Sequence, residues 1–348
     1  MKSKSWIEGD LESLALRWRR DRLWILDQQA LPHEELWMEI HNSRDMIGAI
    51  QSLKVRGAPL IGVAAALALV KDLMQFREIS YTEFRKLAED LAESRPTAIN
   101  LRNSLQRMMH DLSEANFRSQ VPTRAHAIFL EDVELCQRMA SHGASLIQPG
   151  ERILTHCNTG GLATVGSGTA LGVIRQAHEW GREIHVHVDE TRPLLQGARL
   201  TTWELNKLKI PYTLNTDSMA GYLMQLKRID RVLVGADRIC RNGDFANKVG
   251  TYSLAVLCRH HQIPFHCVAP MTTYDPRCGR GEDIPIEERT PEEVLGYVRH
   301  NGVTQWAQVG SAVFNPSFDM TPASLVTSFI TDEGVFSSDQ WLERQRMS

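Results

Sequence analysis

Several features that would place a protein in a familiar class are missing from this sequence. The six cysteines include no Cys-x-x-Cys pair and follow no regular spacing, which argues against a zinc ribbon and a disulfide framework. There is no Gly-Lys-Ser/Thr motif and no His-Glu-x-x-His motif, and Gly166, Gly168 and Gly172 do not have the spacing of a dinucleotide fingerprint. We therefore expect neither a metal nor an organic cofactor.

The chain also lacks a strong charge bias and a long apolar run. It has 39 basic and 42 acidic residues, a net charge of −3, and the two signs are interspersed. Such a balance gives no bulk attraction to nucleic acids or membranes. The apolar run from Leu60 to Val70 is far shorter than a membrane span, and the first ten residues contain no signal-peptide core. We expect a soluble, cytoplasmic protein with free thiols and without nucleic-acid or membrane partners.

Two successive patterns divide the 348 residues, which exceed what a single hydrophobic core usually holds. Alternating apolar residues over 14–26 predict a short β-hairpin, and helical periodicity follows over residues 60–73, 82–94, 99–112 and 124–147. After Pro149-Gly150, short β-branched runs alternate with helical stretches. We predict an α/β fold with a smaller, mainly helical N-terminal lobe over residues 1–148. A larger, Rossmann-like lobe with a doubly wound parallel sheet follows over residues 149–348.

Polar side chains stand where three of the predicted strands end. The predicted strands cover residues 153–157, 184–189, 212–215, 232–237, 265–269 and 325–330. Cys157, Asp189-Glu190 and Asp237 come at three of these ends, and the carboxyl ends of parallel strands form the active-site edge of such a sheet. A thiol and a carboxylate there suggest proton-transfer chemistry. A cysteine alone is more often a buried small hydrophobe, so the prediction depends on the convergence of the three ends.

Other segments are candidates for binding an anion. The loop over residues 158–169 follows a strand and leads into a helix, so its amides either hold an anion or simply close a tight loop. Arg56-Gly57-Ala58-Pro59 precedes an alanine-rich helix, and an arginine beside unpaired amides is a natural phosphate clamp. An ordinary helix entry is the alternative there, as it is for Arg95. Asn247-Lys248 is predicted to begin the helix after the Asp237 strand.

Together these segments resemble the methylthioribose-1-phosphate isomerases of methionine salvage. The resemblance lies in residues 55–62, 94–101, 155–164, 189–200, 235–239, 242–252 and 315–322. The fold is shared with the regulatory subunits of the exchange factor of eukaryotic translation initiation and with ribose-1,5-bisphosphate isomerases, so Asp-Glu-Thr-Arg-Pro and Gly-Ala-Asp alone indicate only the superfamily. Cys157 within His-Cys-Asn-Thr-Gly and Asp237 within Gly-Ala-Asp-Arg favour an active isomerase. Gly161 stands where the family pattern has alanine.

The resemblance implies that 5-methylthioribose 1-phosphate is isomerised to 5-methylthioribulose 1-phosphate, without a cofactor. It implies Asp237 as proton donor to the ring oxygen and Cys157 as the second catalytic group. Hydrogen then moves from C2 to C1, either through an enolate-like intermediate or as a hydride, and the residues are compatible with both routes. Family members are commonly homodimers through the sheet lobe. The implied substrate-binding residues are Arg56, Gly57, Ala58, Arg95, Gln196, Asn247 and Lys248.

Two alternatives fit the same residues. The first is isomerisation of a related sugar phosphate, either ribose 1,5-bisphosphate or 5-deoxyribose 1-phosphate, which differs only in the pocket for the 5-position. The second is a non-catalytic regulatory subunit of the same fold. The presence of Cys157, Asp237 and Lys248 argues against the second alternative.

Overall fold

The computed structural model describes residues 5–95, 99–299 and 302–347 and divides the chain into two compact units. The first unit comprises Met1–Leu135 and Gly161–Gly166, and the second comprises Cys136–Gly160 and Ser167–Ser348. The first break falls inside a long helix, α5 (Phe117–Ala144), whereas the sequence pattern changes only at Pro149-Gly150. The division of the chain into domains over residues 1–148 and 149–348 therefore stays a prediction.

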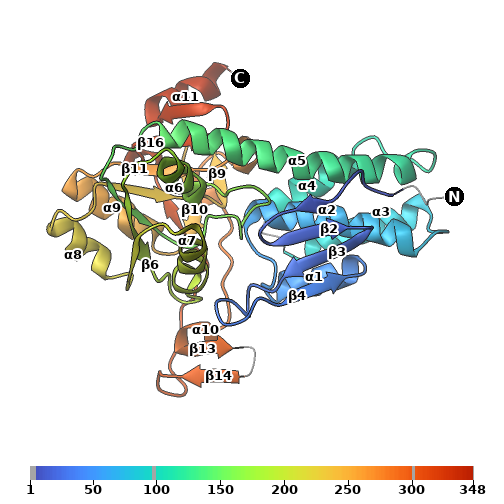
Figure 1. Cartoon of the computed structure of the whole chain (residues 1–348), viewed down its shortest axis with the longest axis horizontal. Coiled ribbons are helices and arrows are strands. Elements are labelled where there is room, and N and C mark those ends of the chain that lie inside the picture. The colour runs from blue at the N-terminus through green and yellow to red at the C-terminus, as the bar shows by residue number, and fades with distance from the viewer. Residues whose placement is uncertain (1–4, 96–98, 300–301, 348) are drawn as a thin grey trace. The chain divides into compact units, whose positions relative to one another are not determined.

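The first unit combines a small antiparallel sheet with a helical core. Its strands are β1 (Leu11–Glu12), β2 (Leu16–Arg19), β3 (Arg22–Leu26) and β4 (Trp37–Ile40), in the order β1-β2-β3-β4. Its helices are α1 (Ser43–Gln51), α2 (Ala58–Gln75), α3 (Tyr81–Glu93), α4 (Ile99–Met109) and the first part of α5. Figure 1 shows the sheet and these helices in blue to green. The predicted hairpin is confirmed as the β2–β3 pair of a larger sheet.

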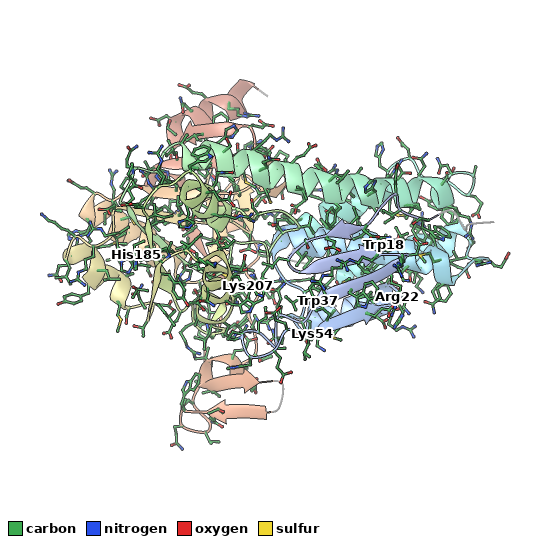
Figure 2. All side chains as sticks on the ribbon, viewed as in Figure 1. Trp18, Arg22, Trp37, Lys54, His185 and Lys207 are labelled. Atoms are coloured by element: carbon green, nitrogen blue, oxygen red, sulfur yellow. The ribbon has the colours of Figure 1, made fainter. Side chains whose placement is uncertain are left out.

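The turn between β2 and β3 explains why this hairpin forms. Arg20 and Asp21 both have positive φ, 50° and 59°, as a two-residue type I′ turn requires. Alternation then separates the two faces, so that Trp18 is buried while Arg22 pairs with Glu39 on the outer face. The Arg17 guanidinium lies over the ring of Trp37 on that face. Figure 2 labels Trp18, Arg22 and Trp37 on this sheet.

Helix α2 is the core helix of the first unit. It begins with Pro at its second residue, Pro59, and packs against α1 and α4. Its 18 residues are long and apolar enough to cross a membrane, but 78% of them are buried inside the protein, as in the core helix of a soluble protein. Even its two charged residues are buried: Lys71 Nζ donates to Asp21 O at 2.8 Å, and Asp72 Oδ1 accepts from Ser43 N at 2.9 Å.

The second unit is built on a seven-stranded sheet. Its strands are β5 (Arg152–Thr155), β6 (His185–Asp189), β7 (Tyr212–Asn215), β8 (Arg231–Val234), β11 (Phe265–Val268), β16 (Ser328–Thr331) and β17 (Gly334–Ser337). The order is β17-β16-β11-β8-β5-β6-β7, and all neighbours are parallel except the β16–β17 hairpin. The six predicted strands are therefore confirmed as one parallel sheet, and β17 is an additional antiparallel edge.

Both faces of this sheet are covered. Its helices are α6 (Ala170–Glu179), α7 (Thr202–Leu208), α8 (Met219–Gln225), α9 (Thr251–His261) and α11 (Ser338–Met347). Adjacent strand residues belong to different cores: Ile153 packs with α6, α7 and the end of α5, whereas Leu154 packs with α8, α9 and α11. Alternation between two buried faces is the doubly wound arrangement that the sequence pattern predicts.

A second, four-stranded sheet corrects one sequence prediction. It contains β9 (Arg238–Cys240), β10 (Phe245–Lys248), β12 (Tyr274–Asp275) and β15 (Phe318–Thr321), in the order β12-β9-β10-β15. Asn247 and Lys248 therefore end a strand and do not begin a helix. The physical reason is the turn at Gly243, where φ is 85°, which folds β9 back onto β10, so that α9 starts only at Thr251.

The remaining elements are short. They are η1 (Gly197–Thr201), η2 (Met271–Thr273), η3 (Gly281–Asp283), α10 (Glu292–Leu295), β13 (Gly296–Arg299), β14 (Gly302–Gln305) and η4 (Ala323–Leu325). The element η1 is a single π-helical turn, and the other three η elements are 3₁₀ turns. All six cysteines are free thiols, as expected, and five of them are buried.

Asp72 gives the first unit a pH-dependent stability. Burial raises the pKa of Asp72 to about 6, so the folded state binds a proton that the unfolded chain has already lost, and stability falls as pH rises towards 6. The difference in free energy of unfolding between Asp72→Asn and wild type should therefore change in favour of the variant by about 1 kcal/mol from pH 5 to pH 7.5. Urea unfolding at the two pH values measures this difference. Asp10→Asn, at an exposed position of the same unit, is the control and should show no such change.

Candidate functional site

The carboxyl edge of the parallel sheet brings three polar strand ends together. Strand β5 lies between β6 and β8, so the residues that follow these strands are neighbours along one edge. Cys157 follows β5, Asp189 ends β6, and Asp237 follows β8. Asp237 is half-buried, and its backbone N–H donates to Ala246 O at 2.9 Å, which ties this edge to β10. The predicted convergence is confirmed.

Cys157 is held in an unusual backbone conformation. Its φ is 65°, in the left-handed region that costs a non-glycine residue about 1–2 kcal/mol. Two hydrogen bonds stabilise it: Cys157 N donates to Thr191 Oγ1 at 2.8 Å, and Thr201 Oγ1 donates to Cys157 O at 2.7 Å. Among the six cysteines, all of which the structure describes, Cys157 alone has a half-exposed side chain. The backbone conformation and these two hydrogen bonds thus fix the position of the thiol.

The segment after β6 is built around its backbone groups. Asp217 accepts from Thr191 N at 2.8 Å and from Arg192 N at 2.7 Å. Gly197 lies so close to Asp189 O that a Cβ atom would be 1.7 Å from it, so no side chain fits there. Just before it, Gln196 is 5% exposed, and its Oε1 atom has no hydrogen-bond partner among the described residues. A buried amide oxygen without a partner is what a site for a polar ligand leaves behind.

Asn247 and Lys248 are buried at the end of β10. Lys248 Nζ donates to Ser317 O at 2.7 Å and lies over the ring of Phe318. Asn247 Nδ2 donates to Thr251 Oγ1 at 2.9 Å, at the start of α9. Lys248 is 7% exposed, and a lysine is seldom this deeply buried unless its charge has partners.

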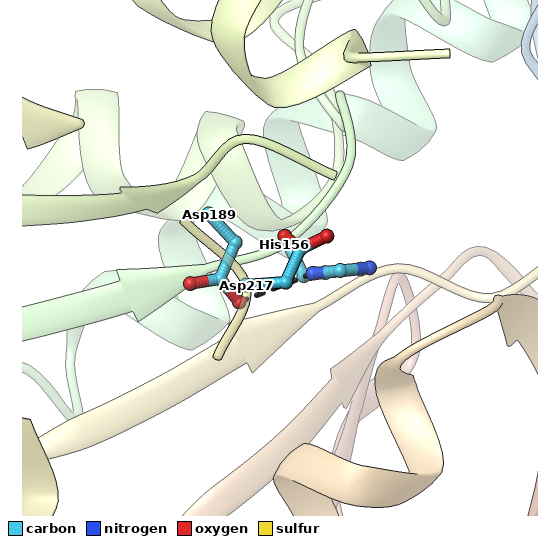
Figure 3. A group of neighbouring side chains, drawn as sticks. All are labelled: His156, Asp189 and Asp217. Carbon is cyan, nitrogen blue, oxygen red and sulfur yellow. Dashed lines mark hydrogen bonds and ion pairs between the residues drawn. The ribbon is translucent and has the colours of Figure 1, made fainter. Parts of the chain in front are cut away.

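A cluster of His156, Asp189 and Asp217 lies beside this edge, and sequence reasoning noted only Asp189 (Figure 3). His156 Nδ1 is 3.1 Å from Asp189 Oδ2, and His156 Nε2 is 2.9 Å from Val249 O. One atom from each of the three residues lies within 4.8 Å of the others, and all are metal-donor types. Hydrogen bonds to Val249 O and from the 191 and 192 amides account for the arrangement, and we assign no ion to it.

Burial and charge act in opposite directions on this cluster. Burial raises the pKa of Asp189 to about 6, against the lowering effect of His156. Burial alone would lower the pKa of His156, but the hydrogen bond and charge of Asp189, with a contribution from Asp217, raise it above its ordinary value. Both shifts favour the protonated form of each partner.

Three predicted binding residues stand at the start of α2 in the first unit. Arg56 is 9% exposed, and its Nε donates to Gln28 Oε1 at 2.9 Å. The amide nitrogen of the Gln28 side chain, Nε2, donates to Leu162 O at 2.7 Å. Gly57 is the N-cap with a φ of 97°, and Ala58 is the first helical residue. Sequence reasoning missed Gln28, which lies 134 positions from its Leu162 partner, so no local pattern signals the contact.

The loop over residues 161–166 is packed against the same part of the first unit. Leu60 N donates to Ala163 O at 3.1 Å, and Val165 N donates to the buried carboxylate of Asp132 at 2.7 Å. Burial raises the pKa of Asp132 to about 6. The Val165 amide is thus already occupied, which favours the tight-loop alternative over an anion site in this part of the loop.

Arg95 follows α3 and is half-buried. Residues 96–98 of the same resembling segment lie outside the described residues. Five of the predicted site residues, Cys157, Gln196, Asp237, Asn247 and Lys248, thus belong to the second unit. Arg56, Gly57, Ala58 and Arg95 belong to the first.

Comparisons with known proteins decide the family. The model of the Initiation factor 2 subunit family matches residues 54–338. The chain is 50% identical over 329 residues to a methylthioribose-1-phosphate isomerase of Cronobacter sakazakii, and the match covers 94% of this chain and 96% of that protein. The chain belongs to the methylthioribose-1-phosphate isomerase family.

Solved structures agree with this isomerase family and with its wider fold. The 5-methylthioribose 1-phosphate isomerase of Pyrococcus horikoshii OT3 is 37% identical, with a TM-score of 0.86, and the match covers 100% of this chain and 98% of that one. The translation initiation factor eIF-2B subunit delta of A. fulgidus is 40% identical, with a TM-score of 0.79 and coverage of 94% and 96%. The resemblance and the α/β fold inferred from sequence are therefore confirmed.

Gly57 should be intolerant of any side chain in this isomerase fold. A Cβ atom there would lie 2.5 Å from Ala163 Cα, and φ is in the left-handed region. We expect Gly57→Ala to lower the free energy of unfolding by at least about 2 kcal/mol, through backbone strain and displacement of the 161–166 loop. Gly9→Ala is the matched control, because Gly9 has a φ of 75° and open space around it, and should cost only about 1 kcal/mol. Equal losses in urea unfolding would contradict the close-approach argument.

Proposed function

We propose that the chain isomerises 5-methylthioribose 1-phosphate to 5-methylthioribulose 1-phosphate in methionine salvage. The observation that carries the proposal is the similarity to an isomerase over nearly the full length of the chain. In addition, Cys157, the one cysteine with a half-exposed side chain, stands at the carboxyl edge of the sheet. The second catalytic group that we propose, Asp237, follows the neighbouring strand. We also propose a cytoplasmic enzyme that needs no metal or organic cofactor and has no nucleic-acid or membrane partner.

The reaction needs help that ordinary aldose isomerisation does not. The anomeric oxygen of the substrate carries the phosphate, so the ring cannot open freely to an aldehyde. The enzyme must break the ring C–O bond and keep the phosphoester. A protonated Asp237 supplies the proton that the departing ring oxygen takes up. Hydrogen then moves from C2 to C1, with Cys157 acting as a thiolate base or as a neutral group lining a hydride path.

The binding residues that we propose have chemistry that suits a sugar phosphate. The cations of Arg56, Arg95 and Lys248 complement a phosphate dianion, and the amides of Gly57 and Ala58 add donors at a helix start. Gln196 Oε1 is buried and has no hydrogen-bond partner in the described part of the chain, which supports a hydrogen bond from a sugar hydroxyl. Asn247 offers an amide at the end of β10 for a second hydroxyl.

Turnover tests this proposal directly. Wild type incubated with 5-methylthioribose 1-phosphate, without added metal or nucleotide, should form the ketose phosphate by NMR. Asp237→Asn and Cys157→Ala should each lower kcat/KM by about 10²–10⁴, because each removes a group that acts on the reacting atoms. Cys136→Ala, which removes a buried thiol elsewhere, is the matched control and should keep its activity. Turnover in D₂O separates the routes, since only the enolate route introduces deuterium at C1.

Other outcomes assign the alternatives. If 5-methylthioribose 1-phosphate is not converted but ribose 1,5-bisphosphate or 5-deoxyribose 1-phosphate is, the proposed mechanism holds and the proposed substrate is wrong. Silence on all three would favour the regulatory function, towards which the similarity to the A. fulgidus protein points.

We further propose a homodimer through the second unit. Helices α8 and α9 contact each other, and both expose apolar side chains, which together make a candidate surface for binding a second copy of the chain. The most exposed are Tyr222, at 61%, and Met219, at 50%. The apolar set on this face is Met219, Tyr222, Leu226, Tyr252 and Val256.

Light scattering after size exclusion checks the dimer. Wild type should elute with twice the mass of the chain. Tyr222→Glu combined with Met219→Glu should shift it to the monomer, because two charges would be buried in the interface. Val309→Glu, at a position that is 76% exposed outside this face, is the control and should remain dimeric. A monomeric wild type, or an unchanged double variant, would remove the α8–α9 face as the contact.

A further inference from the structure

His156 connects three segments that carry the proposed site. It directly precedes Cys157 after β5, its Nδ1 lies 3.1 Å from Asp189 Oδ2 at the end of β6, and its Nε2 lies 2.9 Å from Val249 O, just after β10. Both His156 and Asp189 are 1% exposed. The ring is packed so closely that a Cβ atom on Gly250 would lie 2.9 Å from its Cε1 atom. One imidazole thus joins the Cys157 turn to the end of the strand that bears Asn247 and Lys248.

The hydrogen-bond partners fix the number of protons. A carbonyl oxygen has no hydrogen to give, so the contact with Val249 O requires a proton on His156 Nε2. A neutral imidazole then has a bare lone pair on Nδ1, facing Asp189 Oδ2. That contact is attractive only if one more proton lies between the two atoms, on either the imidazole or the carboxyl group.

The surroundings favour keeping this proton. Asp217 and Glu190 face Asp189 with negative charge, and the carboxyl group of Asp319 lies close enough to interact with both His156 and Lys248. Asp217 accepts two backbone N–H groups, from Thr191 and Arg192, which hold its carboxyl group beside the pair. Asp189 Oδ1 is buried without a hydrogen-bond partner among the described residues, so an ionised Asp189 would be costly. A protonated Asp189 beside a neutral imidazole satisfies these constraints.

We propose that His156 and Asp189 are positioning residues that share one proton and hold the Cys157 turn against the Val249 segment. The pair touches no reacting atom in this proposal and acts through Cys157. The expected effect on activity rests on the proposed function. The sharing of a proton between His156 and Asp189 does not depend on that function.

Raising the pH should remove the shared proton and so weaken the contact that holds the Cys157 turn. Below the ordinary imidazole pKa the shared proton is present and its stabilising effect is complete. The pKa of His156 is raised by Asp189, so the effect is lost as pH rises through a value above that ordinary range. Without the proton, two lone pairs face each other at the 3.1 Å contact.

Asp189→Asn is the decisive variant. An asparagine amide N–H donates to the neutral Nδ1 atom and reproduces the protonated contact, but it cannot titrate. Wild-type kcat/KM should fall by about tenfold per pH unit above the pKa of the pair, whereas Asp189→Asn should stay within about twofold over the same range. Glu190→Gln removes the adjacent carboxylate and serves as the matched control. It should keep an alkaline limb of wild-type slope that begins at a slightly lower pH, because one negative charge beside Asp189 is lost.

A second readout makes the test independent of turnover. The imidazole ¹⁵N shifts of His156 should titrate in wild type above the ordinary histidine range and stay constant in Asp189→Asn over that range. The same alkaline limb in wild type and Asp189→Asn, or the same imidazole titration in both, would overturn the proposal. If Asp189→Asn has no activity at any pH, or wild type turns over none of the three sugar phosphates, the imidazole shifts alone decide between the two results.

Discussion

The left-handed backbone at Cys157 is the constraint on which the arrangement of the second unit depends. A non-glycine residue adopts this conformation only where neighbours over-determine it. Here two threonine hydroxyls fix the amide and the carbonyl of Cys157, and Thr191 Oγ1 in turn donates to Asp189 O at 3.0 Å. The conformation of the Cys157 turn therefore depends on the segment after β6. If that segment moves, the thiol moves with it.

The edge of the sheet could be predicted because it depends on local patterns. Apolar runs mark the strands, and each run is followed within a few residues by a polar group, which is how Cys157, Asp189 and Asp237 could be named from the sequence. The parallel order of β6, β5 and β8 then follows from the alternation of strands and helices. Family resemblance supplied what the pattern lacks, namely the roles of the individual residues.

What the sequence did not reveal depends on long-range contacts or on short elements. Strand β10 has only four residues and ends in Asn247-Lys248, polar residues that look like a helix start when read without their partners in β9 and β15. The turn before it carries Asn242-Gly243, a pair that is typical of a hairpin. His156 and Asp189 lie 33 positions apart, and only the folded sheet makes them a pair.

The 161–166 loop has a consequence for how the chain can be divided. Chain connectivity places it between Cys157 and α6 of the second unit, yet its hydrogen bonds go to Gln28, Leu60 and Asp132 of the first. A cut at residue 148 would leave this stretch in a fragment that contains none of those partners. The two units are thus interleaved along the chain, and neither could have been exchanged between relatives as a continuous cassette without also replacing the contacts of this loop.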